Sequence, residues 1–151
     1  MKSICVDAGF LIGLYDESDE HHEKAAEYFL SFFDSTQNHL LVPWPILYET
    51  VSTRMARKNI KGIKQLEQDW KRLSVQSRLH LLSDAQFRDE AIDDCFEELG
   101  KPPQQYRDLS LVDRVLRKIL SERDLRIHAF VTFNPKDFHD VCGKFGCELL
   151  C

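Results

Sequence analysis

Short apolar segments alternate with longer amphipathic segments along the chain, and this alternation restricts the fold more than any other feature. Segments rich in β-branched and large apolar residues predict strands, and apolar residues at helical spacing predict helices. The expected strands are residues 3–6, 39–42, 79–82, 128–132 and 147–150. The expected helices are residues 10–15, 20–33, 45–58, 63–73 and 83–99, with another that starts at Asp108 or Ser110.

Strands separated by helices predict right-handed crossovers and a parallel sheet with helices on both faces. We therefore expect an α/β fold of three α/β/α layers around a parallel, roughly five-stranded sheet. The 151 residues match the length of one ordinary domain, so residues 1–151 are expected to form a single domain.

Local signals add expected boundaries between these elements. Ser83 and Gln86 have the spacing of a capping box that opens the helix over 83–99. Gly62 allows a break before the helix over 63–73, and residues 100–105 form the clearest loop.

The composition argues against membrane and disulfide-rich classes. No apolar run approaches the roughly 20 residues of a membrane span, and the N-terminus lacks the apolar run of a signal peptide. We therefore expect a cytoplasmic protein with no membrane partner. The five cysteines include no C-x-x-C pair. Cys142, Cys147 and Cys151, with His139 nearby, fit no structural zinc spacing well, so ordinary buried thiols are favoured over a zinc site.

Charge is distributed unevenly along the chain. The net charge is −5, which argues against a broad surface for polyanions. Residues 54–72 hold seven basic and two acidic residues and so carry +5, which leaves −10 for the rest of the chain. Such a window is typical of a solvated helix face or of a local phosphate-binding surface beside an acidic centre. The candidate phosphate-binding residues are Arg54, Arg57, Lys58 and Lys61.

Acidic and amide side chains lie at the ends of several expected elements. Asp7 follows the first strand, where the carboxyl edge of a parallel sheet binds ligands, although it equally suits an N-cap. Glu49 lies early in the helix after the second strand, where a solvated glutamate is also favourable. Asp113 forms a capping-box pattern with Ser110, and a capping role is compatible with a functional one. Asn134 follows the strand over 128–132, as a turn former with Pro135 or as a site residue.

Brought together, these side chains suit a hard divalent cation such as Mg²⁺, which takes oxygen ligands. A bound cation lowers the pKa of its water and stabilises charge on a reacting phosphate. The sequence has no convincing Ser/His/Asp or Cys/His arrangement and no glycine-rich phosphate loop, so nucleophilic side-chain catalysis and nucleotide cradling are unsupported.

Four segments in order resemble the PIN-domain family, which includes the toxin ribonucleases of bacterial toxin–antitoxin pairs. The matching segments are residues 3–12, 45–51, 109–113 and 131–138, and they span almost the whole chain. The resemblance implies a parallel five-stranded sheet, Mg²⁺ or Mn²⁺ as the cofactor and RNA as the substrate. It also implies Asp7, Glu49 and Asp113 as metal ligands, and it is compatible with an antitoxin partner and a homodimer.

Asn134 departs from the pattern, because the family often has an aspartate at this position. An amide has no charge and should support a second metal poorly, so Asp137 would have to compensate. The function expected is a metal-dependent endoribonuclease that hydrolyses RNA phosphodiester bonds. The alternative is a PIN-like domain, weak or inactive in catalysis, that binds RNA or a partner protein. A small-molecule phosphohydrolase with Asp7 as nucleophile would want an aspartate at position 9, which is Gly9.

Overall fold

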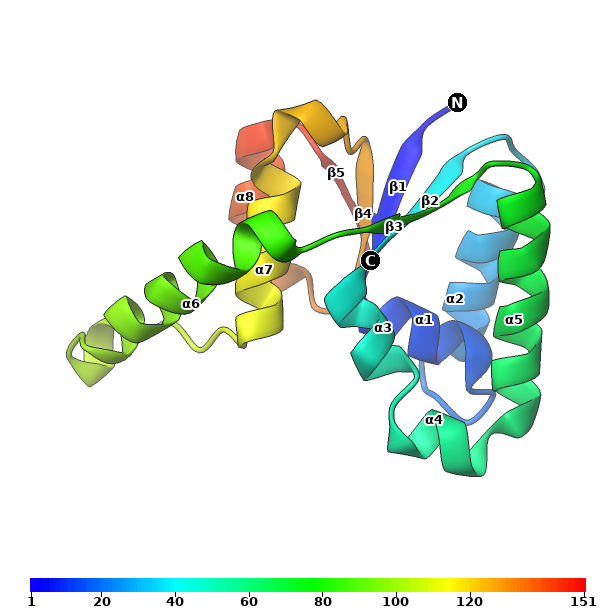
Figure 1. Ribbon diagram of the computed structural model, residues 1–151, viewed down its shortest axis with the longest axis horizontal. Helices are drawn as coiled ribbons and strands as arrows, with labels where there is room; N and C mark the ends of the chain where they lie inside the picture. Colours follow the sequence, from blue (N-terminus) through cyan, green and yellow to red (C-terminus); the bar gives the residue numbers. More distant parts are fainter.

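A five-stranded parallel sheet forms the centre of the molecule, as the computed structural model shows (Figure 1). The structure describes residues 1–151 except for the side chain of Thr53. The strand order is β3-β2-β1-β4-β5, so the order along the chain reverses between β1 and β4. The strands are β1 (Ser3–Val6), β2 (His39–Pro43), β3 (Leu79–Leu82), β4 (Ala129–Val131) and β5 (Glu148–Leu150).

Helices lie on both sides of the sheet and complete the three expected layers. Figure 1 shows α1, α2 and α5 on one side, and α7 and α8 on the other with α6 packed outside α7. The helices are α1 (Ala8–Tyr15), α2 (His22–Phe29), α3 (Trp44–Thr50), α4 (Thr53–Lys58), α5 (Ile60–Val75), α6 (Ala85–Leu99), α7 (Leu111–Ser121) and α8 (His139–Phe145). The expected α/β/α fold class is therefore confirmed.

The core follows from the apolar strands. The side chains of β1 and β4 are almost fully buried, as expected for strands covered on both faces. Phe29 and Phe33 are buried in this core and add aromatic side chains from α2 and the turn after it. Cys142 and Cys147 are also buried as free thiols, as expected, whereas Cys151 is exposed.

The break in the expected helix over 45–58 corrects the sequence prediction. α3 ends at Thr50, and Ser52 has an extended backbone before α4 begins at Thr53. The local cause is the sequence Thr-Val-Ser-Thr, whose β-branched and hydroxyl residues favour a helix less than the flanking segments do.

The boundary expected at Gly62 lies three residues earlier, at Asn59. Asn59 Oδ1 accepts a hydrogen bond of 2.9 Å from Gly62 N and so caps α5. Asn59 Nδ2 donates to Tyr15 O at 2.8 Å, which ties the start of α5 to the end of α1. Gly62 lies inside the first turn of α5, where a Cβ atom would be 2.1 Å from Tyr15 O. The glycine therefore permits close packing and does not break the chain.

The capping box expected at Ser83 and Gln86 is wrong. α6 begins at Ala85, and Asp84 at its cap position makes no side-chain cap bond. The Asp84 carboxylate instead accepts bonds of 2.9 and 2.8 Å from the Arg88 guanidinium. A salt bridge one turn along the helix has thus taken the place of the cap.

Other elements extend the sequence prediction. α2 begins at His22 and continues as a π-helical turn over Leu30–Asp34. Short 3-10 turns occupy Pro103–Gln105, Arg123–Leu125 and Pro135–Asp137. α8 was not expected from the sequence. Among the described residues, no helix has both the length and the apolar character needed to cross a membrane.

Candidate active site

Asp7 lies at the point where the strand order of the sheet reverses. β1 and β4 are neighbours there, and Asp7 N donates to Val131 O at 3.2 Å. Asp7 also caps α1, because its Oδ1 accepts a bond of 2.8 Å from Phe10 N. The capping role considered for Asp7 is therefore real, and it fixes the carboxylate at the crevice where open α/β sheets bind ligands.

Thr132 holds the other oxygen of this carboxylate. Thr132 Oγ1 donates a bond of 2.5 Å to Asp7 Oδ2 and accepts one of 3.0 Å from Asn134 N. Thr132 is completely buried at the end of β4. Sequence reasoning missed this residue. The available signal was a hydroxyl side chain directly after an apolar strand, in the position that mirrors Asp7 after β1.

Asp113 lies in the first turn of α7 and forms the predicted capping box. Its Oδ2 accepts bonds from Ser110 N at 3.0 Å and Ser110 Oγ at 2.7 Å, and its own N–H donates to Ser110 Oγ at 3.0 Å. The reciprocal bonds fix the first turn of α7 and with it the position of the Asp113 carboxylate. The capping role of Asp113 is therefore compatible with a role in a site near Asp7.

The pKa values of Asp7 and Glu49 are affected by neighbouring acids. Burial raises the pKa of Asp7, the bonds from Thr132 and Phe10 N oppose this rise, and the nearby Asp113 carboxylate adds to it. Burial also raises the pKa of Glu49 on α3, with further contributions from Asp113 and then Asp7. Acids from three separate segments therefore lie near enough for Asp113 to affect the pKa of Asp7 and for Asp113 and Asp7 to affect that of Glu49.

This donor set fits a divalent cation in its chemistry. The charged neighbours that raise the pKa of Asp7 and Glu49 are carboxylates, and a cation would offset their repulsion. In the described part of the chain, no three acid, imidazole or thiol side chains surround one point closely enough to hold an ion as they stand. The bonds from Ser110 to Asp113 Oδ2 help to explain this, because they turn that oxygen toward the start of α7.

Asn134 lies next to the site but is engaged elsewhere. Its side-chain amide donates a hydrogen bond to Asp137 Oδ2, and its side chain is exposed. The Asn134 amide and Asp137 therefore form a polar pair after β4. Asn134 is linked to Asp7 through its backbone N–H, which donates to Thr132 Oγ1.

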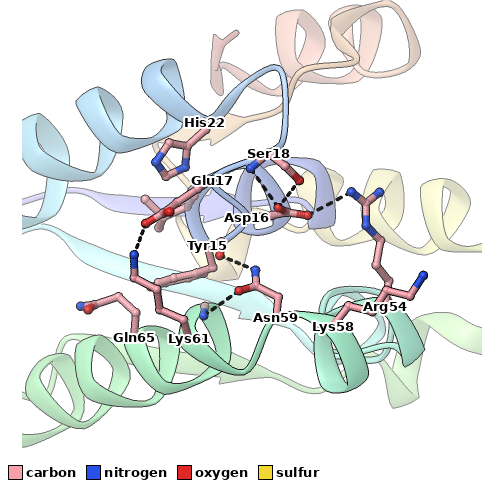
Figure 2. A pocket seen from close by; sticks show the side chains of 12 residues that line it. Tyr15, Asp16, Glu17, Ser18, His22, Arg54, Lys58, Asn59, Lys61 and Gln65 are labelled. Atoms are coloured by element: carbon pink, nitrogen blue, oxygen red, sulfur yellow. Dashed lines mark hydrogen bonds and ion pairs between the residues drawn. The ribbon is translucent and has the colours of Figure 1, made fainter.

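The predicted basic residues gather at the other end of α1. Arg54, Lys58 and Lys61 line a pocket of about 460 Å³ (Figure 2). Arg54 pairs with Asp16 at 3.2 Å and Lys61 with Glu17 at 2.5 Å. Arg57 is not among the residues that line this pocket.

The pocket and the acids are separated by the length of α1. Its eight residues span about 12 Å between Asp7 and the Asp16 end. The predicted basic residues Arg54, Lys58 and Lys61 therefore lie apart from Asp7, at the opposite end of α1.

The arrangement defines a PIN-like α/β/α domain with an acidic centre at its switch point. The fold is similar to that of VapC20 from Mycobacterium tuberculosis, a toxin described as cleaving the sarcin-ricin loop. The two have a TM-score of 0.60 and 15% sequence identity, over 91% of this chain and 94% of that one. The sequence matches no protein-family model and no curated protein. The resemblance to PIN-domain proteins is thus confirmed at the level of the fold.

Proposed function

We propose that residues 1–151 act as a single metal-dependent endoribonuclease domain that hydrolyses RNA phosphodiester bonds. The observation that carries the proposal is the proximity of Asp7, Glu49 and Asp113 near the switch point: the Asp113 carboxylate adds to the raised pKa of Asp7, and Asp113 and Asp7 both add to that of Glu49. The similarity of the fold to a toxin that cleaves RNA supports the same reaction class.

Each residue has a distinct role in this proposal. Asp7 and Asp113, with Glu49, would hold Mg²⁺ or Mn²⁺. When bound, such an ion supplies an activated water and stabilises charge on the reacting phosphate. Thr132 holds the Asp7 carboxylate through its hydrogen bond and opposes the rise in its pKa, and the Ser110 cap keeps Asp113 in position. Arg54, Arg57, Lys58 and Lys61 would bind flanking phosphates of the RNA.

The test is cleavage of single-stranded and structured RNA by the purified protein. We expect cleavage with Mg²⁺ or Mn²⁺, none with EDTA, and a loss on the order of a hundredfold or more in Asp7→Asn and Asp113→Asn. Asp93→Asn is the matched control, because Asp93 is an exposed acid on α6. Cleavage that survives both EDTA and Asp7→Asn would exclude the proposal.

The second candidate function is RNA or protein binding without cleavage. The neutral Asn134, tied to Asp137, favours it because this pair adds no free charge for a second metal. RNA binding by a protein that shows no turnover at any Mg²⁺ or Mn²⁺ concentration would support this candidate over the nuclease.

A role as a toxin is a further part of the proposal. It implies an antitoxin protein as a partner, and a homodimer is compatible with it. Expression of the chain should then arrest growth, and co-expression of the neighbouring gene should relieve the arrest. Growth arrest that persists in Asp7→Asn would show that the effect does not come from nuclease activity.

A further inference from the structure

An open groove separates α3 from α6 and α7, and the candidate active site does not account for it. Its volume is about 460 Å³, and its walls are mainly apolar. Pro45 and Tyr48 from α3 form one wall, and Ile92 from α6 with Leu111 and Val112 from α7 form the other. Figure 1 shows these three helices facing one another beside the sheet.

One aromatic side chain of α3 lines this groove, and a second lies beside it. Tyr48, which lines the groove, has 73% of its surface exposed, and Trp44, one helical turn earlier, has 41% exposed. Their ring centroids are 6.2 Å apart and the rings are tilted by 39°. Neighbouring aromatic faces in solvent are typical of interaction surfaces, so this pair is a candidate contact for a ligand in the groove.

The groove is lined by the two helices that carry Glu49 and Asp113. Tyr48 immediately precedes Glu49 on α3, and Val112 immediately precedes Asp113 on α7. The two helices that carry the acids therefore also carry the two apolar walls. A ligand in the groove would therefore lie beside the helices that carry Glu49 and Asp113.

The charges at the groove select for an uncharged group. Asp84 and Asp89 line it, and the one guanidinium among its lining residues, that of Arg88, is already bound to Asp84 at 2.8 and 2.9 Å. A phosphate would be repelled by this acidic rim. A flat heterocyclic ring whose amino groups donate hydrogen bonds would instead be favoured by both the aromatic faces and the carboxylates.

We propose that the groove binds an unpaired RNA base next to the scissile phosphate, stacked on Tyr48 with Trp44 beside it. This inference rests on the proposed nuclease function, because RNA is the ligand that joins a phosphate at the acids to a ring in the groove. Tyr48 and Trp44 are then substrate-positioning residues that require a single-stranded or flipped-out nucleotide at the cleavage point.

The first experiment measures binding apart from cleavage. A short mixed-sequence single-stranded RNA, labelled for fluorescence anisotropy, is titrated with the full chain in EDTA. Tyr48→Ala should weaken binding about tenfold, and Tyr48→Phe, which keeps the ring, should stay within about twofold. Tyr106→Ala is the matched control, since Tyr106 is 41% exposed and lies outside the groove. Equal binding losses in Tyr48→Ala and Tyr106→Ala would overturn the proposal.

The second experiment locates the base. In a Trp70→Phe background, Trp44 is the remaining tryptophan, and RNA should quench its fluorescence. A series of RNAs is then made, each with a single abasic nucleotide at a different position. For one of them, the missing base should weaken binding to wild type about tenfold. The same RNA should bind Tyr48→Ala as tightly as intact RNA binds Tyr48→Ala. Quenching by an apolar peptide but not by RNA would overturn the proposal and assign the groove to a protein partner.

Cleavage assays then separate the two proposals. One outcome is that the protein binds RNA in EDTA, with weaker binding in Tyr48→Ala and unchanged binding in Tyr48→Phe, yet never cuts RNA with Mg²⁺ or Mn²⁺. In that case the nuclease proposal fails and the base-binding groove stands. If wild type cuts RNA and both Tyr48→Ala and Trp44→Ala cut and bind it equally well, the groove proposal fails and the nuclease stands.

Discussion

Thr132 Oγ1 donates a hydrogen bond of 2.5 Å to Asp7 Oδ2 across the adjoining ends of β4 and β1. The two residues are 125 positions apart in the sequence. Burial raises the pKa of Asp7, and the Thr132 bond is the strongest influence that opposes this rise. The threonine therefore helps to keep Asp7 ionised, which is the form that a cation ligand requires.

Thr132→Val tests this relationship. The valine keeps the shape but removes the donor, so the pKa of Asp7 should rise further and the acidic limb of the pH–rate profile should move to higher pH. We expect a fall in kcat/KM of roughly 10–100-fold, the usual effect of removing a partner of a metal ligand. The free energy of unfolding should fall by about 1–2 kcal/mol, because Asn134 N also loses its acceptor.

Thr132→Ser is the control for Thr132→Val, because it retains the hydroxyl. Its pH–rate profile should superimpose on that of wild type. A profile that is unshifted in Thr132→Val would show that the hydrogen bond does not govern the ionisation of Asp7.

Asp7→Asn should separate activity from stability. The folded-state pKa of Asp7 lies above its unfolded value, so its stabilising contribution is full below the unfolded pKa and is lost as pH rises through the folded pKa. Asparagine stays neutral, and it can still cap α1 by accepting from Phe10 N. Asp7→Asn should therefore be inactive yet more stable than wild type at pH 7.

Thermal unfolding without metal, measured from pH 7 downward, checks this prediction. The difference between Asp7→Asn and wild type should shrink as the pH falls toward about 4, the unfolded pKa of an aspartate. A variant less stable than wild type throughout this range would contradict the assigned cause of the pKa rise.

The strands could be predicted from sequence because their signal is local. Each expected strand agrees with the structure to within one residue at either end, since short apolar runs are bounded by polar and turn-forming residues. The break between α3 and α4 and the cap at Asn59 could not be predicted in the same way. They depend on contacts such as Asn59 Nδ2 to Tyr15 O, which joins residues 44 positions apart.

The candidate site was predicted only as far as its acids. Asp7 and Asp113 were predicted because they follow a strand and begin a helix, and Asp113 lies near enough to affect the pKa of both Asp7 and Glu49. Their roles as metal ligands stay predictions. Thr132 was missed because a threonine after a strand is also common in ordinary β structure. Its hydrogen-bond partner, Asp7, can be identified only once the pairing of β1 with β4 is known.

Gly62 and Gly143 form a matched pair of helical glycines with opposite expected effects. An added Cβ at Gly62 would lie 2.1 Å from Tyr15 O, whereas at Gly143 it would meet nothing within 4 Å. Gly62→Ala should therefore lower the free energy of unfolding by about 1–3 kcal/mol or more through overpacking. Gly143→Ala should raise it by roughly 0.5–1 kcal/mol through helix propensity. Chemical denaturation of both variants measures the two values, and equal effects would contradict the close approach of α5 to Tyr15.

Lys58→Ala tests whether the basic pocket at the end of α1 binds RNA phosphates. Lys58 is exposed and lines this pocket (Figure 2). If its ammonium neutralises one phosphate, the plot of log binding constant against log salt concentration should lose about 1 from its slope in Lys58→Ala. Lys144→Ala provides the control, because Lys144 is exposed on α8. Binding should weaken uniformly across RNA sequences, since a phosphate contact carries no base information. An unchanged slope in Lys58→Ala would remove this pocket from the path of the RNA and leave the acids and the adjoining groove to define it.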